Sequence, residues 1–153
     1  MARQLLLQFS ASGQLFAIES MLIIEIIPLV NLTRVPATAE YISGLYNFRG
    51  DLIPIIDISM LLFHQPAKEH ICTRIIITEI EYGDSRHRAG IIAEQVNQTL
   101  VNDTDNINTH NLAGNDAPYI RQIIRHHDNN IQLLDISELL PAKMLQIQQA
   151  MNA

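Results

Sequence analysis

The chain opens on a segment in which hydrophobic and polar positions alternate with the period of a β-strand. In residues 4–10, Leu5, Leu7 and Phe9 share one face, while polar residues share the other with Leu6. Hydrophobic runs of similar length recur along the chain between turn residues, and each predicts a further strand. These runs are residues 14–19, a segment that ends at Pro28, and residues 44–48, 52–56, 73–82, 88–96, 119–124 and 131–134. The pattern therefore predicts a mainly β protein built largely from hairpins.

Helical signals are few and short. Residues 57–62 predict a short helix that starts near Asp57, and Thr38 is expected to cap a second short helix through Ile42. The remaining expected features are a turn of helix at Met21, an irregular Asn- and Asp-rich loop with one short strand over residues 97–116, and an amphipathic C-terminal helix over about residues 142–152.

One segment of the chain is repeated. Residues 53–62 and residues 131–140 are identical at six of ten positions, at an offset of 78 residues, and each follows a turn. Chance similarity among abundant Ile and Leu is the alternative, but the shared Asp-Ile-Ser makes it a weaker explanation. The repeat predicts two related subdomains, each ending in a strand, an Asp and a short helix. Asp57 and Asp135 are then expected to cap these helices rather than to catalyse a reaction.

Composition narrows the class of protein. The chain has 24 Ile and 18 Leu among 153 residues but only 5% aromatic residues, so a strand-rich aliphatic core is expected and global disorder is excluded. The formal net charge of −6 and the scattered basic residues argue against nucleic acid as a partner. Neither a transmembrane run nor a signal peptide is apparent, and the single Cys72 has no internal disulfide partner. A cytoplasmic protein without direct membrane insertion is expected.

The sequence contains no motif that points to catalysis or to a cofactor. The six histidines lack the spacing that places two metal ligands on one face, so no metal site is expected. They are His64, His70, His87, His110, His126 and His127. Neither a glycine-rich phosphate loop nor a nucleophile elbow occurs, and no local feature activates Cys72. We therefore expect a binding module, with no catalytic residues and no cofactor.

The segment around the Arg49-Gly50-Asp51 hairpin carries a family motif. Residues 36–58 read Pro-Ala-Thr-Ala-Glu-Tyr-Ile-Ser-Gly-Leu-Tyr-Asn-Phe-Arg-Gly-Asp-Leu-Ile-Pro-Ile-Ile-Asp-Ile, which closely resembles the hallmark of the CheW family of chemotaxis coupling proteins. Residues 16–26, 90–96 and 131–140 are similar to other family segments, in the same order along the chain. The resemblance spans nearly the whole chain, and its Asn-x-Arg-Gly turn is the most specific part.

The resemblance implies a fold and a set of partners. The fold is a single CheW-like domain over residues 1–153, made of two intertwined five-stranded SH3-like β-barrels. The expected boundaries are about 14–66 for the first subdomain, about 70–140 plus strand 4–10 for the second, and about 142–152 for the C-terminal helix. The implied function is a non-enzymatic adaptor that joins the cytoplasmic tip of a chemoreceptor to the regulatory domain of a CheA-type histidine kinase, at receptor arrays on the inner face of the membrane.

The resemblance also implies roles for individual residues. Positions that match receptor- or kinase-binding positions of the family are Ile23, Glu25, Gly44, Arg49 and Gly90. Positions of the structural motif are Asn47, Gly50, Asp57 and Asp135. Each binding position also has a structural alternative: Ile23 as core, the glycines as backbone devices, and Glu25 paired with Arg49. An apolar groove between the barrels, with Glu25 and Arg49 at its rim, would suit an amphipathic receptor helix.

The sequence departs from the family pattern at a few places. Phe48 replaces the usual Leu of the hairpin, residues 121–127 lack the usual glycine-rich run, and residues 97–116 are rich in Asn. These departures leave two alternatives open. One is a divergent module of a non-flagellar chemosensory pathway, and the other is a self-assembling or ligand-binding module that has lost kinase coupling.

Overall fold

The chain folds into an almost entirely β structure. The computed structural model describes residues 3–36, 38–103 and 119–140. The strands are β1 (Arg3–Ala11), β2 (Gln14–Glu19), β3 (Ile23–Pro28), β4 (Ile42–Phe48), β5 (Asp51–Asp57), β6 (Arg74–Tyr82), β7 (Ser85–Asp103), β8 (Ile120–His126) and β9 (Asn129–Leu134). The helical elements are η1 (Ser20–Leu22), α1 (Ile58–Phe63) and a turn of helix over residues 136–140. The mainly β prediction is confirmed.

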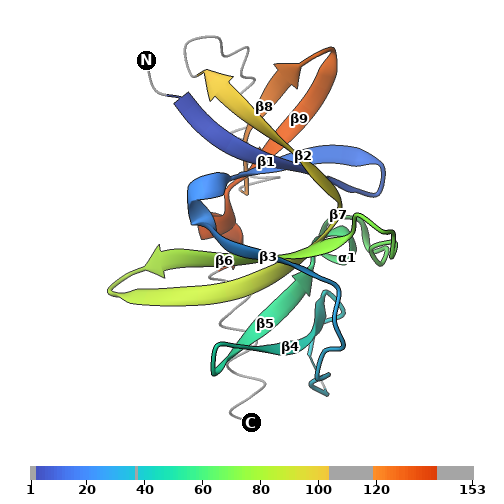
Figure 1. Cartoon of the computed structure of the whole chain (residues 1–153), viewed down its shortest axis with the longest axis vertical. Coiled ribbons are helices and arrows are strands. Elements are labelled where there is room, and N and C mark those ends of the chain that lie inside the picture. The colour runs from blue at the N-terminus through green and yellow to red at the C-terminus, as the bar shows by residue number, and fades with distance from the viewer. Residues whose placement is uncertain (1–2, 37, 104–118, 141–153) are drawn as a thin grey trace.

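The strands form two five-stranded halves that share the long strand β7 (Figure 1). Half A pairs its strands in the order β7-β1-β2-β9-β8, and half B in the order β3-β6-β7-β5-β4. The two orders are equivalent, because the one parallel pair of each half, β2–β9 or β7–β5, occupies the same place. β7 passes from half B to half A near Gln95, a residue with φ of +50°. This arrangement agrees with the expected pair of intertwined SH3-like barrels.

The strand pairings divide the chain differently from the expected ranges 14–66 and 70–140. β2 pairs with β1 and β9 in half A, whereas β6 pairs with β3 in half B. The chain therefore crosses between the halves twice, once at η1 and once within β7. Half B is one continuous stretch of chain from β3 to the first part of β7, whereas half A combines β1 and β2 with the end of β7, β8 and β9.

The 78-residue repeat corresponds to a repeated turn. The Asp57 amide donates to the Tyr41 carbonyl at 2.7 Å, and the Asp135 amide donates to the Tyr119 carbonyl at the same distance. These two tyrosines are themselves 78 residues apart. The Asp57 carboxylate accepts from the amides of Ser59 and Met60 and so caps α1, while Asp135 Oδ1 accepts from the Glu138 amide.

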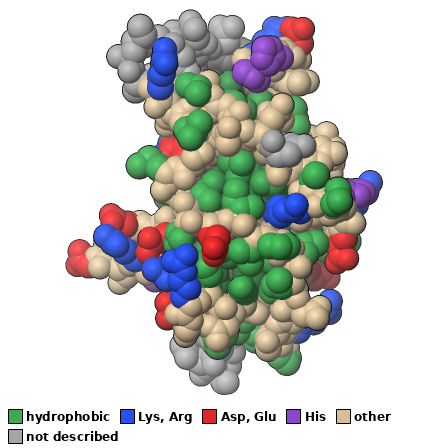
Figure 2. Space-filling view, viewed as in Figure 1, with side chains coloured by type: hydrophobic (Ala, Val, Ile, Leu, Met, Phe, Trp, Pro, Cys, Tyr) green, Lys and Arg blue, Asp and Glu red, His purple; other side chains and the backbone are tan. Residues whose placement is uncertain are grey.

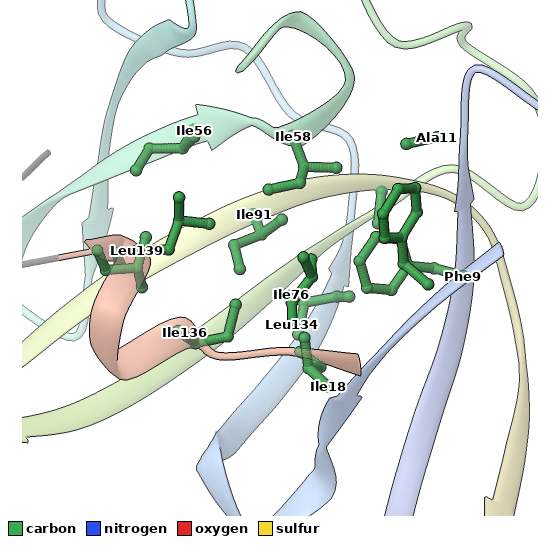
Figure 3. Close-up of a cluster of buried hydrophobic side chains, with 14 of the residues drawn as sticks. Phe9, Ala11, Ile18, Ile56, Ile58, Ile76, Ile91, Leu134, Ile136 and Leu139 are labelled. Carbon is green, nitrogen blue, oxygen red and sulfur yellow. The ribbon is translucent and has the colours of Figure 1, made fainter. Parts of the chain in front are cut away.

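Three hydrophobic clusters stabilise the fold, and the largest lies between the halves. Figure 3 shows Phe9 and Ile18 of half A facing Ile76 and Ile91 of half B, with Ile136 beside them. The other two clusters are the interiors of half B and half A. The space expected to form an apolar groove between the barrels is filled, at these residues, by this buried cluster. The aliphatic excess of the sequence thus supplies three cores instead of the two that the repeat suggests.

Two predicted elements differ from the structure. Thr38 caps no helix, because residues 40–41 form a turn and the Thr38 hydroxyl donates to the Val35 carbonyl at 2.9 Å. β7 does not end at Val96 but continues to Asp103, because pairing with β1 buries Leu100 while the intervening residues carry polar side chains. The remainder of the expected 97–116 loop and the expected helix over 142–152 lie outside the described residues.

Candidate protein-interaction site

Three of the five expected binding residues lie in one row across half B. Glu25 of β3 is paired with Ile77 of β6, Ile77 with Gly90 of β7, Gly90 with Ile55 of β5, and Ile55 with Gly44 of β4. Paired residues of a sheet project to the same face, so the whole row shares one orientation. The row joins segments that lie up to 65 residues apart (90 − 25), but Glu25 and Gly44 lie at its opposite ends.

The two glycines of this row are buried and closely packed. A Cβ atom at Gly44 would lie 2.7 Å from the Thr33 carbonyl oxygen, and one at Gly90 would lie 2.4 Å from Ile55 Cδ1. Close backbone and side-chain approach therefore accounts for both glycines without a partner protein. This packing favours the alternative interpretation, in which both glycines serve as backbone devices.

Strand β3 presents an apolar, exposed edge. It is the end strand of half B, and among the described strands it pairs with β6 alone. Glu25 and Ile26 are exposed, Ile23 is half-buried, and Met21 just before the strand is 85% exposed. Figure 2 shows hydrophobic side chains gathered across the middle of this face of the molecule, where β3 runs in Figure 1. An exposed apolar edge strand of this kind is typical of a protein-interaction surface.

Arg49 lies at the tip of the β4–β5 hairpin. It has a left-handed backbone with φ of +51°, followed by Gly50, whose amide donates to Asn47 Oδ1 at 3.0 Å. Its guanidinium lies 4.7 Å from the centre of the Phe48 ring. Phe48, a departure from the family pattern, thus gives Arg49 a cation–π platform that leucine would not provide. The turn holds an exposed cation in a conformation that non-glycine residues seldom adopt.

The expected alternative of a Glu25–Arg49 ion pair is wrong, since neither side chain makes a salt bridge within the described residues. The neighbouring cation Arg88 does form ion pairs, at 3.5 Å from Asp51 and 3.4 Å from Glu79. Its guanidinium also lies over the Phe48 ring. Arg88 is therefore neutralised locally, whereas Arg49 makes no salt bridge with the described residues.

Sequence reasoning missed several residues of this surface. Met21 and Ile26 were assigned only to a helical turn and a strand, and Arg88 only to a strand. The hydrophobic residues on both sides of Glu25 could have indicated this surface. An edge strand that carries a single charge exposes some of its hydrophobic side chains. For Arg88 the signal was weaker, since its partner Asp51 lies 37 residues away (88 − 51).

The described residues carry little chemistry beyond recognition. Within residues 3–36, 38–103 and 119–140, no three His, Cys, Asp or Glu side chains gather as a metal site would require. None of the helices in these ranges is long and apolar enough to span a membrane. Burial raises the pKa of the Tyr41 hydroxyl above its ordinary value, so this phenol stays protonated near neutral pH. The charge of the surface is set by its carboxylates and guanidiniums.

Comparisons with known proteins agree on one family. The family model described as a CheW-like domain matches residues 5–144. The chain is 24% identical over 147 residues to the chemotaxis protein CheW of Treponema pallidum, covering 92% of this chain and 84% of that protein. It is 23% identical to the chemotaxis protein CheW of Helicobacter pylori, covering 86% of this chain and 78% of that protein.

A solved structure supports the fold. The crystal structure of the scaffolding protein TtCheW from Thermoanaerobacter tengcongensis superimposes with a TM-score of 0.76 at 24% identity. The similarity covers 88% of this chain and 85% of that one.

Proposed function

This chain belongs to the family of CheW-like domains, and from this premise we propose that it is a non-enzymatic adaptor that couples chemoreceptors to a CheA-type histidine kinase. The observation that carries the proposal is the match to the CheW-like domain over residues 5–144. The partners proposed are the cytoplasmic tip of a receptor and the regulatory domain of the kinase, and the proposed place of action is the receptor array on the inner face of the membrane.

The geometry of half B suits two kinds of contact with a partner, one apolar and one charged. The exposed edge of β3, with Met21 and Ile26, offers apolar area for a hydrophobic partner surface. The hairpin tip offers the guanidinium of Arg49, which makes no salt bridge within the described residues and suits an acidic side chain or a carbonyl. Apolar area supplies affinity, whereas the charge at Arg49 sets orientation and partner choice. Both features are expected in an adaptor that assembles with more than one protein.

The direct test is a binding experiment with partners from the same organism. The purified chain should retain a receptor tip fragment and the kinase regulatory domain in a pull-down, and the three together should raise kinase activity above that of the kinase alone. A folded chain that binds neither partner would refute the proposal. Stable homo-oligomers without either partner would favour the self-assembling alternative.

Arg49→Ala is expected to weaken assembly while leaving the fold intact. Loss of the cation–π contact with Phe48 costs about 0.5–1 kcal/mol of stability at an exposed site. Loss of an interface arginine reduces partner affinity about ten-fold. Isothermal titration with each partner measures the affinity, and thermal melting measures the stability.

Arg86→Ala is the matched control for Arg49→Ala. Arg86 is also an exposed arginine of half B, but it pairs with Glu81 at 3.6 Å on the β6–β7 hairpin. Its removal changes the net charge equally and is expected to leave both affinities within about two-fold. Equal losses in the two variants would show that only the overall charge matters. A steep loss of stability in Arg49→Ala would make Arg49 a structural residue.

A further inference from the structure

Half B contains a cleft in addition to the β3 edge and the hairpin tip. The cleft has a volume of about 900 Å³ and lies between the connection after β3 and the segment after α1. Its buried lining includes Ile42, Asp57 and Ile92, while Glu40 and Glu69 are exposed at its rim. This volume falls within the range of small-ligand pockets. The cleft therefore has room for a ligand around a buried carboxylate.

The equivalent place in half A is occupied by an arginine of the chain itself. The Arg121 guanidinium contacts Glu19 Oε1 and lies 3.5 Å from Asp135 Oδ2. Gln4 also donates to Glu19 Oε1, at 3.0 Å. Half A thus uses the carboxylate of its repeated Asp to hold a guanidinium.

The repeat identifies which residues of half B correspond to this ion triad. Ser43 and Arg121 are 78 residues apart, and each is the unpaired residue at a register shift, between Ile42 and Gly44 or between Ile120 and Gln122. Half B therefore has a short hydroxyl side chain where half A has a guanidinium.

The partner carboxylate of the triad is also replaced. Asp57 lies opposite Ile92 in the parallel pair of half B. Leu133 pairs with Ala17 in half A, and two residues further along each strand are Asp135 and Glu19. Ile92 thus stands where half A has Glu19. Ser43, Asp57 and Ile92, which line the cleft, therefore correspond to Arg121, Asp135 and Glu19 of half A.

Asp57 retains the capacity to accept one more hydrogen bond. Its Oδ1 accepts from the amides of Ser59 and Met60, and its Oδ2 accepts from the Ala67 amide at 2.9 Å. An ionised carboxylate has about four acceptor sites, so three donors leave one unused. Among the described residues that line the cleft are three carboxylates and one guanidinium, that of Arg34, which gives these residues a formal charge of 1 − 3 = −2. A cation is the favoured ligand.

We propose that this cleft binds a guanidinium or primary ammonium group on an aliphatic stem, with Asp57 as the inner carboxylate and Glu40 and Glu69 at the rim. The apolar side chains of Leu32, Met60 and Ile92 contact the stem, and the charged end occupies the place that Arg121 has in half A. The ligand is either a small free cation or an arginine side chain of another protein. This site is independent of the adaptor function, because its evidence comes from the cleft and the repeat alone.

The test is an NMR titration of the full chain with two isosteric probes, n-butylguanidinium and the neutral n-butylurea. Butylguanidinium is expected to shift the amide signals of Ser59, Met60 and Ala67, and added salt is expected to weaken the effect. Butylurea is expected to bind about ten-fold more weakly, because it lacks the charge. No shift with butylguanidinium, or equal shifts with both probes, would overturn the proposal.

A second arm of the titration distinguishes the two sources of the cation. The peptide Gly-Gly-Arg-Gly-Gly is compared with the same peptide carrying citrulline in place of arginine. Shifts at the same three amides with the arginine peptide assign the site to a side chain of another protein. Shifts with butylguanidinium alone assign it to a small free cation. Either result supports a cation site.

Ser43→Arg tests the equivalence of the two halves directly. The new guanidinium is expected to reach Asp57 as Arg121 reaches Asp135, which would abolish the butylguanidinium shifts and raise the Tm by about 2 °C. Ser43→Met is the matched control, since it adds a side chain without charge and should keep the shifts. Retained shifts in Ser43→Arg would count against the proposal. Glu69→Gln, at an exposed position, gives an independent measure and should weaken binding about two-fold.

Discussion

Gly44→Ala is expected to destabilise the protein by about 3 kcal/mol and to lower the Tm by roughly 6–12 °C. The new methyl group would lie 2.7 Å from the Thr33 carbonyl oxygen and 2.9 Å from Leu32 Cβ. Because the first of these atoms is backbone, the clash cannot be relieved by rotating a side chain. The φ of Gly44 is +152°, a conformation that alanine rarely adopts, so backbone strain adds to the clash.

The affected contact also joins β4 to the connection that precedes it. Thr33 and Leu45 exchange two backbone hydrogen bonds, of 3.1 and 2.8 Å, across an isolated bridge. Moving Thr33 away from a methyl group at position 44 would lengthen both bonds. This bridge connects the segment after β3 to β4. Because β3 and β4 are the two end strands of half B, loss of the bridge opens the half at that side.

Thermal and urea unfolding of Gly44→Ala measure this effect, and Gly83→Ala is the control. Gly83 also has a positive φ, of +63°, but a Cβ there would meet nothing within 4 Å. The control therefore includes the conformational cost of replacing glycine, about 1 kcal/mol, without the clash. Equal losses of stability in the two variants would show that the contact with Thr33 is unimportant.

This result bears on how binding defects at Gly44 should be interpreted. We expect Gly44→Ala to lose partner binding in proportion to its loss of folded protein, whereas Arg49→Ala should lose binding while still folded. Measuring affinity at a temperature well below both melting transitions separates the two causes. A folded Gly44→Ala protein with weak binding would place Gly44 in the interface itself.

The local elements of this fold could be predicted because their signals are contiguous in sequence. The Arg49-Gly50 turn and the Asp57 cap depend on residues within a few positions of one another, so turn and capping preferences identify them. The repeat of Asp57 and Asp135 likewise predicts two equivalent turns. Its extension to Tyr41 and Tyr119 was not recognised, because two matching residues carry no weight until their carbonyls are seen to accept the same hydrogen bond.

The way in which the strands are shared between the halves could not be predicted. β2 and β9 form a parallel pair although the paired residues are 116 positions apart in sequence (131 − 15), and no local pattern encodes such a pairing. The same limitation hid the row from Glu25 to Gly44, which exists only after β3, β6, β7, β5 and β4 are placed side by side. The family resemblance named residues of this row, but only the pairing shows that they share it.

The late part of β7 was predicted only as an irregular loop with one short strand, for a different physical reason. Residues 97–103 are mostly polar, and a strand with isolated hydrophobic residues resembles a loop when its partner is unknown. In the structure, Leu100 packs in the interior of half A beside Leu6, the residue with which it is paired. The burial of Leu100 and the pairing of residues 98–103 with β1 hold this segment as a strand.

Gly90→Ala is expected to cost about 2–3 kcal/mol by overpacking the interior of half B. Gly90 lies on the central strand β7, and its Cβ would approach Ile55 Cδ1 to 2.4 Å and Ile75 Cγ2 to 2.9 Å. Both isoleucines are fully buried, so neither has free space into which to move. Loss of receptor binding in such a variant would therefore follow from damage to the core, since position 90 is not exposed to a partner.

A double-variant cycle tests whether the contact with Ile55 is the cause. Ile55→Val removes Cδ1 and alone costs about 1 kcal/mol of stability. The double variant with Gly90→Ala should lose about 1 kcal/mol less stability than the sum of the two single losses. Ile77→Val is the matched control, because its Cδ1 would lie 3.4 Å from the new methyl group and its removal relieves less of the overpacking. Urea unfolding of the three single and two double variants gives the coupling energies. Additive losses with Ile55→Val would mean that the strain is relieved through the backbone of β7, and the buried packing of Gly90 would then not explain its importance.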